Sequence, residues 1–127
     1  MKTRYAVALG MLAGFGLGAV AIQGLHAQTT PPVYYISEVD MTNPDGYAKD
    51  YLPLVQATIK AAGGRYVAWG KATPLDGDPP KSRIAVVAWD SMETLMAWRN
   101  SDAFKKARET GMKYASFRSF AIPGTPQ

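Results

Sequence analysis

The sequence contains no cysteine, and its only histidine is His26. Cysteine and histidine supply the usual nucleophile and general base of enzymes, and they are preferred ligands of zinc and haem iron. Because the chain is so poor in both, we expect no metal and no cofactor. Any chemistry must use Asp, Glu, Tyr, Arg, Lys or Ser side chains. Without cysteine there is no disulfide, so the stability of the fold has to come from packing.

The N-terminus has the pattern of a secretory signal peptide. Two basic residues, Lys2 and Arg4, precede an apolar run over residues 5–22, and Ala27 supplies a small residue before the expected cleavage site. We therefore predict that residues 28–127 are periplasmic or secreted and have no membrane contact after cleavage. The alternative is an uncleaved N-terminal membrane anchor, because 18 apolar residues are at the lower limit for crossing a bilayer.

The sequence also has only a small excess of charge of one sign. The formal net charge is +4, and cleavage of the leader would lower it to +2. Such a balance provides no strong field for attracting nucleic acid. The aspartates Asp76 and Asp78 fall in a turn rich in glycine and proline, where Asp bonds its own backbone, and they do not complete a calcium-binding loop. We predict no nucleic-acid partner and no metal site.

Hydrophobic periodicity predicts four strands and two helical regions. The strands are rich in β-branched and aromatic residues, whereas the helices repeat apolar residues every three or four positions. Gly63 and Gly64 end the first helix, since glycine accepts the left-handed conformation there, and Pro53 should kink it. The expected strands are 33–40, 65–69, 83–89 and 114–122, and the helical regions are 43–62 and 90–109, the second interrupted at 100–102.

Each helical region has a predicted buried side. In the second region a capping box of Asp90 and Glu93 is expected to start the helix, and the basic Lys105, Lys106 and Arg108 are interpreted as a solvated face. The inward residues of the first region are Tyr47, Tyr51, Leu54, Val55, Ile59 and Ala62, the two tyrosines being packing residues, and those of the second are Met92, Leu95, Met96 and Trp98.

The element order βαββαβ predicts an α+β fold of the ferredoxin-like type. Right-handed connections place the first and third strands in the centre of a four-stranded antiparallel sheet, with both helices on one face. The other face would carry Tyr34, Ile36, Phe120 and Ile122. A bare apolar face of this size is rare in a soluble monomer, so we predict a homodimer packed sheet to sheet. The predicted organisation is a signal peptide 1–27, a tether 28–32, one domain 33–124 and a tail 125–127.

The ordered motifs of the chain resemble a known family. They are the joint Gly63-Gly64-Arg65-Tyr66 between helix and strand, Ser91-Met92-Glu93 after the third strand, Trp98 seven residues after that serine, and Arg118 inside the last strand. This set is similar to the domain-of-unknown-function 1330 family of the dimeric α+β barrel superfamily, over about residues 34–124. The resemblance implies a ferredoxin-like fold and a barrel built from two subunits, but no established activity. At Trp69 and Arg99 many members carry an arginine and a tyrosine instead, which implies a pocket of different polarity.

Glu38 and Arg118 are the candidate catalytic residues. If Tyr34 faces the barrel, strand alternation points Glu38 the same way, and an antiparallel last strand brings Arg118 beside it. One interpretation is a structural ion pair at the mouth of the barrel. The other is a ligand pocket, in which Arg118 holds an anionic group and Glu38 acts as acid or base. In that pocket we expect Tyr34, Tyr66 and Trp69 as further ligand-binding residues.

Two functions remain open. The first is an exported homodimer that binds a small, largely apolar molecule in its barrel. The second is a cofactor-free enzyme, of the isomerase or monooxygenase type, acting on a small aromatic or dicarbonyl compound. The scarcity of histidine and cysteine favours the first. RNA recognition modules share the βαββαβ order, but residues 83–89 lack their glycine and aromatic pattern.

Overall fold

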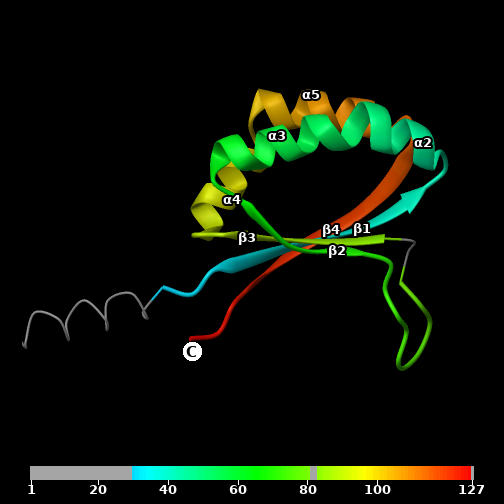
Figure 1. Ribbon diagram of the computed structural model, residues 1–127. Coiled ribbons are helices and arrows are strands. Elements are labelled where there is room, and N and C mark those ends of the chain that lie inside the picture. Colours follow the sequence, from blue (N-terminus) through cyan, green and yellow to red (C-terminus); the bar gives the residue numbers. More distant parts are fainter. Residues whose placement is uncertain (1–29, 81–82, 127) are drawn as a thin grey trace, which may run out of the picture. The chain divides into compact units, whose positions relative to one another are not determined.

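The computed structural model describes residues 30–80 and 83–126, so the predicted signal peptide lies outside the described residues (Figure 1). Residues 32–125 form one unit. Among the described residues, no helix has the length and apolar character needed to cross a bilayer. The elements are β1 (Val33–Met41), α2 (Pro44–Gly46), the π-helical turn η1 (Tyr47–Tyr51), α3 (Leu52–Ala62), β2 (Arg65–Gly70), β3 (Arg83–Trp89), α4 (Met92–Arg99), α5 (Asp102–Gly111) and β4 (Ala115–Pro123).

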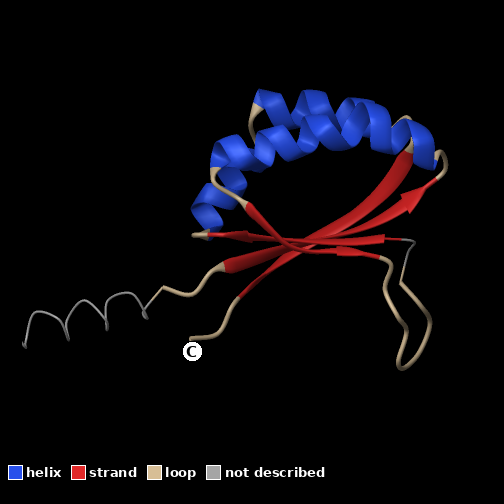
Figure 2. Ribbon diagram, viewed as in Figure 1, coloured by secondary structure: helices blue, strands red, loops and turns tan. Residues whose placement is uncertain are grey.

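The four strands form one sheet in the order β2-β3-β1-β4. All three pairs of neighbouring strands are antiparallel, and Glu38 of β1 lies opposite Ile84 of β3 and Arg118 of β4. The helices cover one face of this sheet, and no helix of the described residues covers the other (Figure 2). The predicted α+β fold and the central position of the first and third strands are therefore confirmed.

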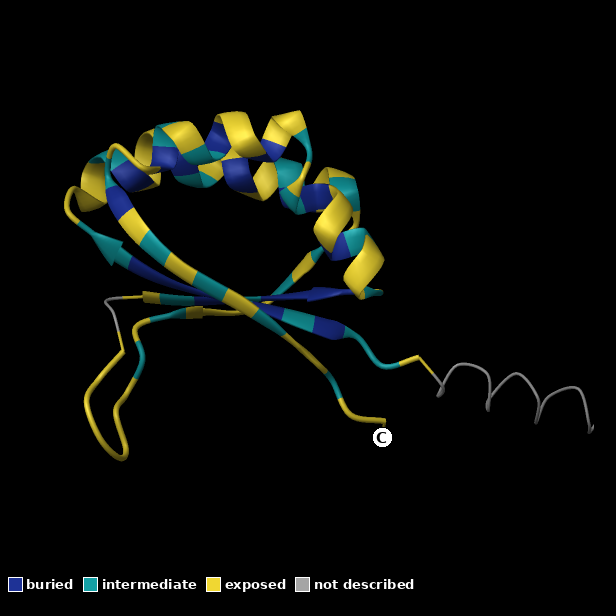
Figure 3. Cartoon of the chain, turned by 180° about the vertical axis from the view of Figure 1, so that it is seen from behind, coloured by how far each residue is buried: buried dark blue, intermediate teal, exposed yellow. Residues whose placement is uncertain are grey.

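Side chains along β1 alternate between the two faces of the sheet. Val33, Tyr35 and Val39 belong to the core between sheet and helices, whereas Tyr34 and Ile36 on the opposite face are only half-buried. The same alternation is visible along β4 in Figure 3, where teal and yellow positions follow one another. Alternate residues of one strand thus serve two different surfaces.

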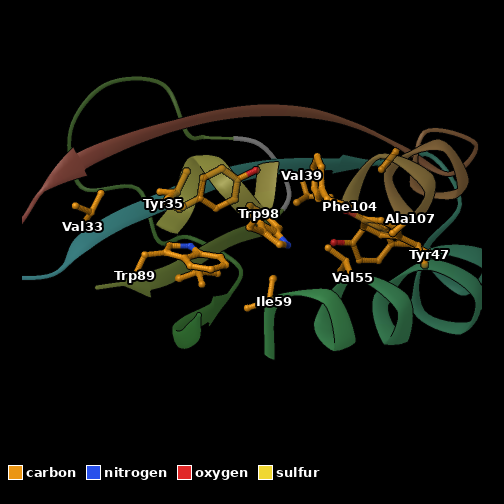
Figure 4. Close-up of a cluster of buried hydrophobic side chains, with 14 residues drawn as sticks. Val33, Tyr35, Val39, Tyr47, Val55, Ile59, Trp89, Trp98, Phe104 and Ala107 are labelled. Carbon is orange, nitrogen blue, oxygen red and sulfur yellow. The ribbon is translucent and has the colours of Figure 1, made fainter. Parts of the chain in front are cut away.

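Aromatic rings fill the space between the sheet and the helices (Figure 4). The ring of Trp98 meets Tyr35 edge-on at a centroid distance of 5.2 Å and lies 4.5 Å from that of Phe104. The indole N–H of Trp98 donates a hydrogen bond to Thr58 Oγ1 at 3.0 Å. The prediction that Trp98 belongs to the core is confirmed.

The predicted kink at Pro53 takes the form of the π-helical turn η1. In a regular helix the proline ring would clash with the carbonyl of Lys49, and its missing N–H would leave that carbonyl unbonded. With the wider turn before it, Pro53 falls in the first turn of α3, where no N–H is needed. The helix ends at Gly63, whose φ of 97° confirms the glycine cap. The buried positions follow a four-residue spacing through Tyr47, Tyr51, Val55 and Ile59, so the prediction that Leu54 is buried is wrong.

The start of α4 differs from the prediction. Its N-cap is Ser91, whose hydroxyl accepts a hydrogen bond from the backbone N–H of Thr94 at 3.0 Å. The expected capping box that begins at Asp90 is therefore wrong, and the Asp90 carboxylate instead lies 3.5 Å from the Arg65 guanidinium. Leu95 and Trp98 are buried as predicted, but Met92 and Met96 are exposed, because they lie away from the helix side that carries that pair.

Candidate functional site

The predicted contact between Glu38 and Arg118 is confirmed. The two residues are direct partners across β1 and β4, and Arg118 Nη2 donates to Glu38 Oε2 at 3.0 Å. The pair is asymmetric, since the Glu38 side chain is 11% exposed and that of Arg118 is 74% exposed. A buried carboxylate is costly without a partner, and Arg118 supplies that partner to Glu38.

Glu38 and Arg118 lie on the sheet face that the helices leave open, which we call the open face. The predicted apolar character of this face is borne out by its large side chains. Phe120 is 45% exposed and Ile122 is 49% exposed, and Tyr34 is half-buried beside them. The open face therefore combines an ion pair whose carboxylate is buried with a group of accessible apolar side chains.

Tyr66 and Trp69 are not on the open face. A β-bulge interrupts the pairing of β2 with β3 between Tyr66 and Ala68. Tyr66 lies opposite Val87, and the bulge after it brings Trp69 opposite Ala85. Both partners face the helices. The five predicted ligand-binding residues therefore divide into two groups. Tyr34, Glu38 and Arg118 share the open face, whereas Tyr66 and Trp69 belong to the interior.

A second group of polar side chains lies in that interior, and we call it the tyrosine cluster. It consists of Tyr35, Tyr47, Tyr51 and Tyr66 together with Arg108. These residues line a cavity of about 20 Å³, the size of one water molecule. The remaining lining residues are Ser37, Val39, Val55, Ile59, Ala85, Val87, Trp98 and Phe117.

The role of Arg108 differs from the sequence-based interpretation. Its Nε donates to the Tyr51 hydroxyl at 3.2 Å, and its Cζ lies 3.8 Å from the ring centroid of Phe117. Arg108 therefore turns inward instead of belonging to a solvated basic face. The available signal was its spacing, because Arg108 follows the buried Phe104 by four positions and so shares its side of the helix.

Two hydroxyls of the tyrosine cluster have no hydrogen-bond partner within the described part of the protein. Tyr35 accepts hydrogen bonds from Arg99 Nη1 at 3.3 Å and from Arg108 Nη2 at 3.5 Å. Among the described residues, by contrast, neither Tyr47 nor Tyr66 has a side-chain hydrogen bond, although both line the cavity. Hydroxyls that lack a protein partner are normally bonded by water or by a ligand. These two are therefore free to bind an oxygen or nitrogen atom brought into the cavity.

Burial keeps these phenols protonated. Desolvation raises the pKa of Tyr66 from its ordinary value to about 12. Desolvation also raises the pKa of Tyr47, with a further contribution from Tyr51 nearby, and it raises the pKa of Tyr51 against the opposing effect of the Arg108 cation. At neutral pH the cavity thus presents neutral O–H groups, which can donate as well as accept hydrogen bonds.

Trp69 lies at the edge of the tyrosine cluster. Its ring is parallel to that of Tyr47, with an interplanar angle of 4° and a centroid distance of 6.2 Å, and the residue is 39% exposed. The guanidinium of Arg83 lies 6.0 Å from the Trp69 ring. The π-helical turn η1 carries Tyr47 and Tyr51 into the interior, and such turns are frequent at functional sites.

The donors of the tyrosine cluster are phenols, a serine hydroxyl and a guanidinium. In the described part of the chain, His, Cys, Asp and Glu residues do not come together in a group of three that would hold a metal ion. Phenols and guanidinium groups match oxygen atoms of an organic molecule better than they match a divalent cation.

Sequence and structure comparisons agree with this fold. The family model described as "Domain of unknown function (DUF1330)" matches residues 32–125. The chain belongs to the DUF1330 family. The resemblance read from the ordered motifs is thereby confirmed, including its extent. No curated protein matches the sequence.

Solved structures similar to this DUF1330 chain share its fold at low sequence identity. The RPA0582 protein of unknown function from Rhodopseudomonas palustris is 13% identical, with a TM-score of 0.64 over 86% of this chain and 94% of its own. SnoaB, a cofactor-independent oxygenase from Streptomyces nogalater, is 9% identical, with a TM-score of 0.58 over 76% and 96%. A conserved protein of unknown function from Bacteroides thetaiotaomicron, titled a possible oxidoreductase, is 13% identical, with a TM-score of 0.53 over 76% and 100%.

Proposed function

We propose that this protein is an exported homodimer that binds a small, largely apolar molecule bearing one hydroxyl or carbonyl oxygen. The ligand would occupy the tyrosine cluster of each protomer, and the open face would form the dimer. The observation that carries the proposal is the pair of unpartnered hydroxyls, Tyr47 and Tyr66, on the cavity between sheet and helices.

The lining of this cavity supports binding over chemistry. Its described residues offer apolar surface from Val39, Val55 and Phe117 and hydrogen bonds from the tyrosines, but they include no carboxylate to act as a base. The cavity has room for about one water molecule, so a larger ligand requires the lining side chains to move apart.

The open face supports the homodimer. Phe120 and Ile122 would be covered by the sheet of a second copy, and the solvent-facing Arg118 would be withdrawn from water together with Glu38. The Glu38–Arg118 pair would then fix how the two sheets align. Any alignment of the sheets that separates the two charges inside an apolar interface is energetically costly.

Native mass spectrometry of the protein purified from the periplasm tests export and assembly together. We expect a dimer of residues 28–127, part of it carrying the additional mass of a bound small molecule. A full-length mass would contradict leader cleavage and favour the membrane anchor. A species that stays monomeric at high concentration would contradict the open face as an interface.

The ligand site is tested with p-cresol and toluene, which differ by one hydroxyl group. NMR titration should give a dissociation constant for p-cresol that is about two- to tenfold lower than that for toluene, the expected value of one net hydrogen bond. In the double variant Tyr47→Phe/Tyr66→Phe this difference should vanish. Tyr34→Phe removes a similar hydroxyl from the open face and should leave the difference between the two dissociation constants unchanged. If Tyr34→Phe removes the preference for p-cresol and the double variant keeps it, the ligand binds on the open face, which contradicts a site in the tyrosine cluster.

A cofactor-free enzyme is the second candidate. It is favoured by Arg108 and the protonated phenols, which would stabilise negative charge on a substrate oxygen, and by the fold shared with the cofactor-independent oxygenase SnoaB. An oxygen electrode in the presence of an electron-rich phenol or a 1,3-dicarbonyl compound tests it. Oxygen uptake that Tyr66→Phe abolishes would favour the enzyme, and no uptake above the protein-free rate would exclude oxygenation of those compounds.

A further inference from the structure

A second pocket opens between α4 and the edge strand β4. Its volume is about 200 Å³, and Tyr35 is the one residue that it shares with the lining of the tyrosine cluster. The polar lining side chains are Arg99, Tyr35 and Ser119, and the apolar ones include Leu95, Met96 and Ala121. One side of this pocket is therefore apolar and the other carries a cation.

Arg99 has no carboxylate partner among the described residues. Its guanidinium donates to the Tyr35 hydroxyl at 3.3 Å, and its Cζ lies 4.7 Å from the ring centroid of Phe104. Both partners are uncharged, so the positive charge of Arg99 is not neutralised in this part of the protein. A guanidinium has five N–H donors, and one hydrogen bond to a phenol leaves most of them available.

A second cation reinforces the first. Arg108 Nη2 lies 3.5 Å from the same Tyr35 oxygen, and the Arg108 Cζ lies 4.8 Å from the ring centroid of Phe104. The donating nitrogens of the two arginines are therefore within about 7 Å of each other, a distance at which like charges repel. An anion placed between or beside them would reduce that repulsion.

Tyr35 supplies a donor to the same place. Its oxygen accepts from both arginines, and its own hydrogen has no acceptor among the described residues. Two charged donors polarise this hydroxyl and make it a stronger donor itself. Because the Tyr35 side chain is buried, a group that accepts this hydrogen must enter the pocket.

Packing alone is the simpler explanation for Arg99, since its stem and guanidinium cover the Phe104 ring. Packing accounts for the position of one arginine. It does not account for a second guanidinium on the same phenol oxygen, or for the absence of any carboxylate partner for either arginine within the described ranges.

We propose that the pocket between α4 and β4 binds a small organic carboxylate, whose oxygens accept from Arg99 and the Tyr35 hydroxyl while its apolar body lies on Leu95, Met96 and Ala121. Guanidinium and carboxylate groups match in charge and geometry. The volume is below that of sites for drug-sized ligands, about 300 Å³ and above, so the body is one ring or a short aliphatic chain. Tyr35 lines both sites, but this inference does not rest on the proposed function, which requires neither Arg99 nor a charged ligand.

Titration with benzoate and with its uncharged analogue benzamide tests the proposal. NMR spectra of the whole protein at neutral pH and low salt should show benzoate shifting the backbone signals of Leu95 and Ser119, with a dissociation constant about tenfold lower than that for benzamide. In Arg99→Gln this preference should fall to about onefold, and Tyr35→Phe should weaken benzoate binding by about three- to tenfold. Equal binding of the two compounds to the wild-type protein would overturn the proposal.

Matched variants separate the pocket from general charge effects. Arg65→Gln removes the same charge on β2, at the other edge of the sheet, and should leave benzoate binding unchanged. Arg99→Lys retains the charge and should retain a preference for benzoate over benzamide. If Arg99→Gln fails to fold, loss of this preference in Arg99→Lys would contradict the proposal. Benzoate binding that survives in folded Arg99→Gln, or benzoate-induced shifts centred on Arg118, would contradict the proposal. The p-cresol titration of Arg99→Gln should match that of the wild-type protein, so a failure of one site is distinguishable from a failure of the other.

Discussion

The two faces of the sheet differ in how their charged side chains are paired. On the open face a carboxylate, Glu38, is buried and its cation, Arg118, reaches solvent. On the helix-covered face the cations Arg99 and Arg108 contact phenols and aromatic rings, with no carboxylate partner among the described residues. A complete ion pair suits the dimer contact proposed for the open face, whereas arginines without a carboxylate suit the anion pocket proposed for the other face. Both faces come from the same strands, divided only by alternation.

The largest expected difference between the faces is in stability. Trp98→Ala on the helix-covered side should lower the free energy of unfolding by about 3–5 kcal/mol, since it leaves a large cavity and removes the hydrogen bond to Thr58. Phe120→Ala on the open face should cost less than about 1 kcal/mol in the monomer, because Phe120 is already half-exposed there. Urea denaturation at a concentration where the protein is monomeric measures both. Equal losses would mean that the open face is as tightly packed as the core.

The next effect concerns the ion pair of the open face. Arg118→Ala should lower the free energy of unfolding by about 1–3 kcal/mol, because it leaves the buried Glu38 carboxylate without its partner. The double variant Glu38→Gln/Arg118→Ala should be more stable than Arg118→Ala alone, since no unpaired charge then remains. Thermal denaturation of the three proteins checks this order. If the double variant is the least stable, Arg118 does not act through the Glu38 charge.

The smallest effect is the alkaline response of the tyrosine cluster. Tyr66 has a folded-state pKa raised to about 12, above its ordinary value of 10.0, so its contribution to stability is complete below pH 10 and is lost as pH rises toward 12. Tyr66→Phe should therefore make stability between pH 10 and 12 less dependent on pH, by on the order of 1 kcal/mol. Denaturant titrations at several pH values measure the slope. Tyr34→Phe on the open face should keep the wild-type slope.

Much of the fold follows from local patterns in the sequence. The four strands and the helical regions are set by apolar spacing, and Gly63 by the conformation that ends α3. The pairing of Glu38 with Arg118 was also predictable, because strand order and antiparallel direction are enough to place the two side by side. These features depend on short-range periodicity and on a few rules of connection.

The division of the candidate site was not predictable in this way. Trp69 points to the helices because a bulge near Val67 shifts the register of β2 against β3. Arg108 turns inward because the Tyr51 hydroxyl and the Phe117 ring, from other elements, lie beside it. Each of these outcomes depends on a neighbour that is distant in sequence, and a single inserted residue reverses the face of every side chain beyond it.

The amino-acid sequence by itself determined the order of elements, the scarcity of histidine and cysteine as metal ligands, and the sheet face left without helices. Only the tertiary structure decided that Arg108 and Arg99 meet at the hydroxyl of Tyr35 and that Tyr47 and Tyr66 line one cavity. The physical reason is that periodicity specifies which side of an element is buried, whereas the partner of a polar group is specified by where separate elements bring their side chains together.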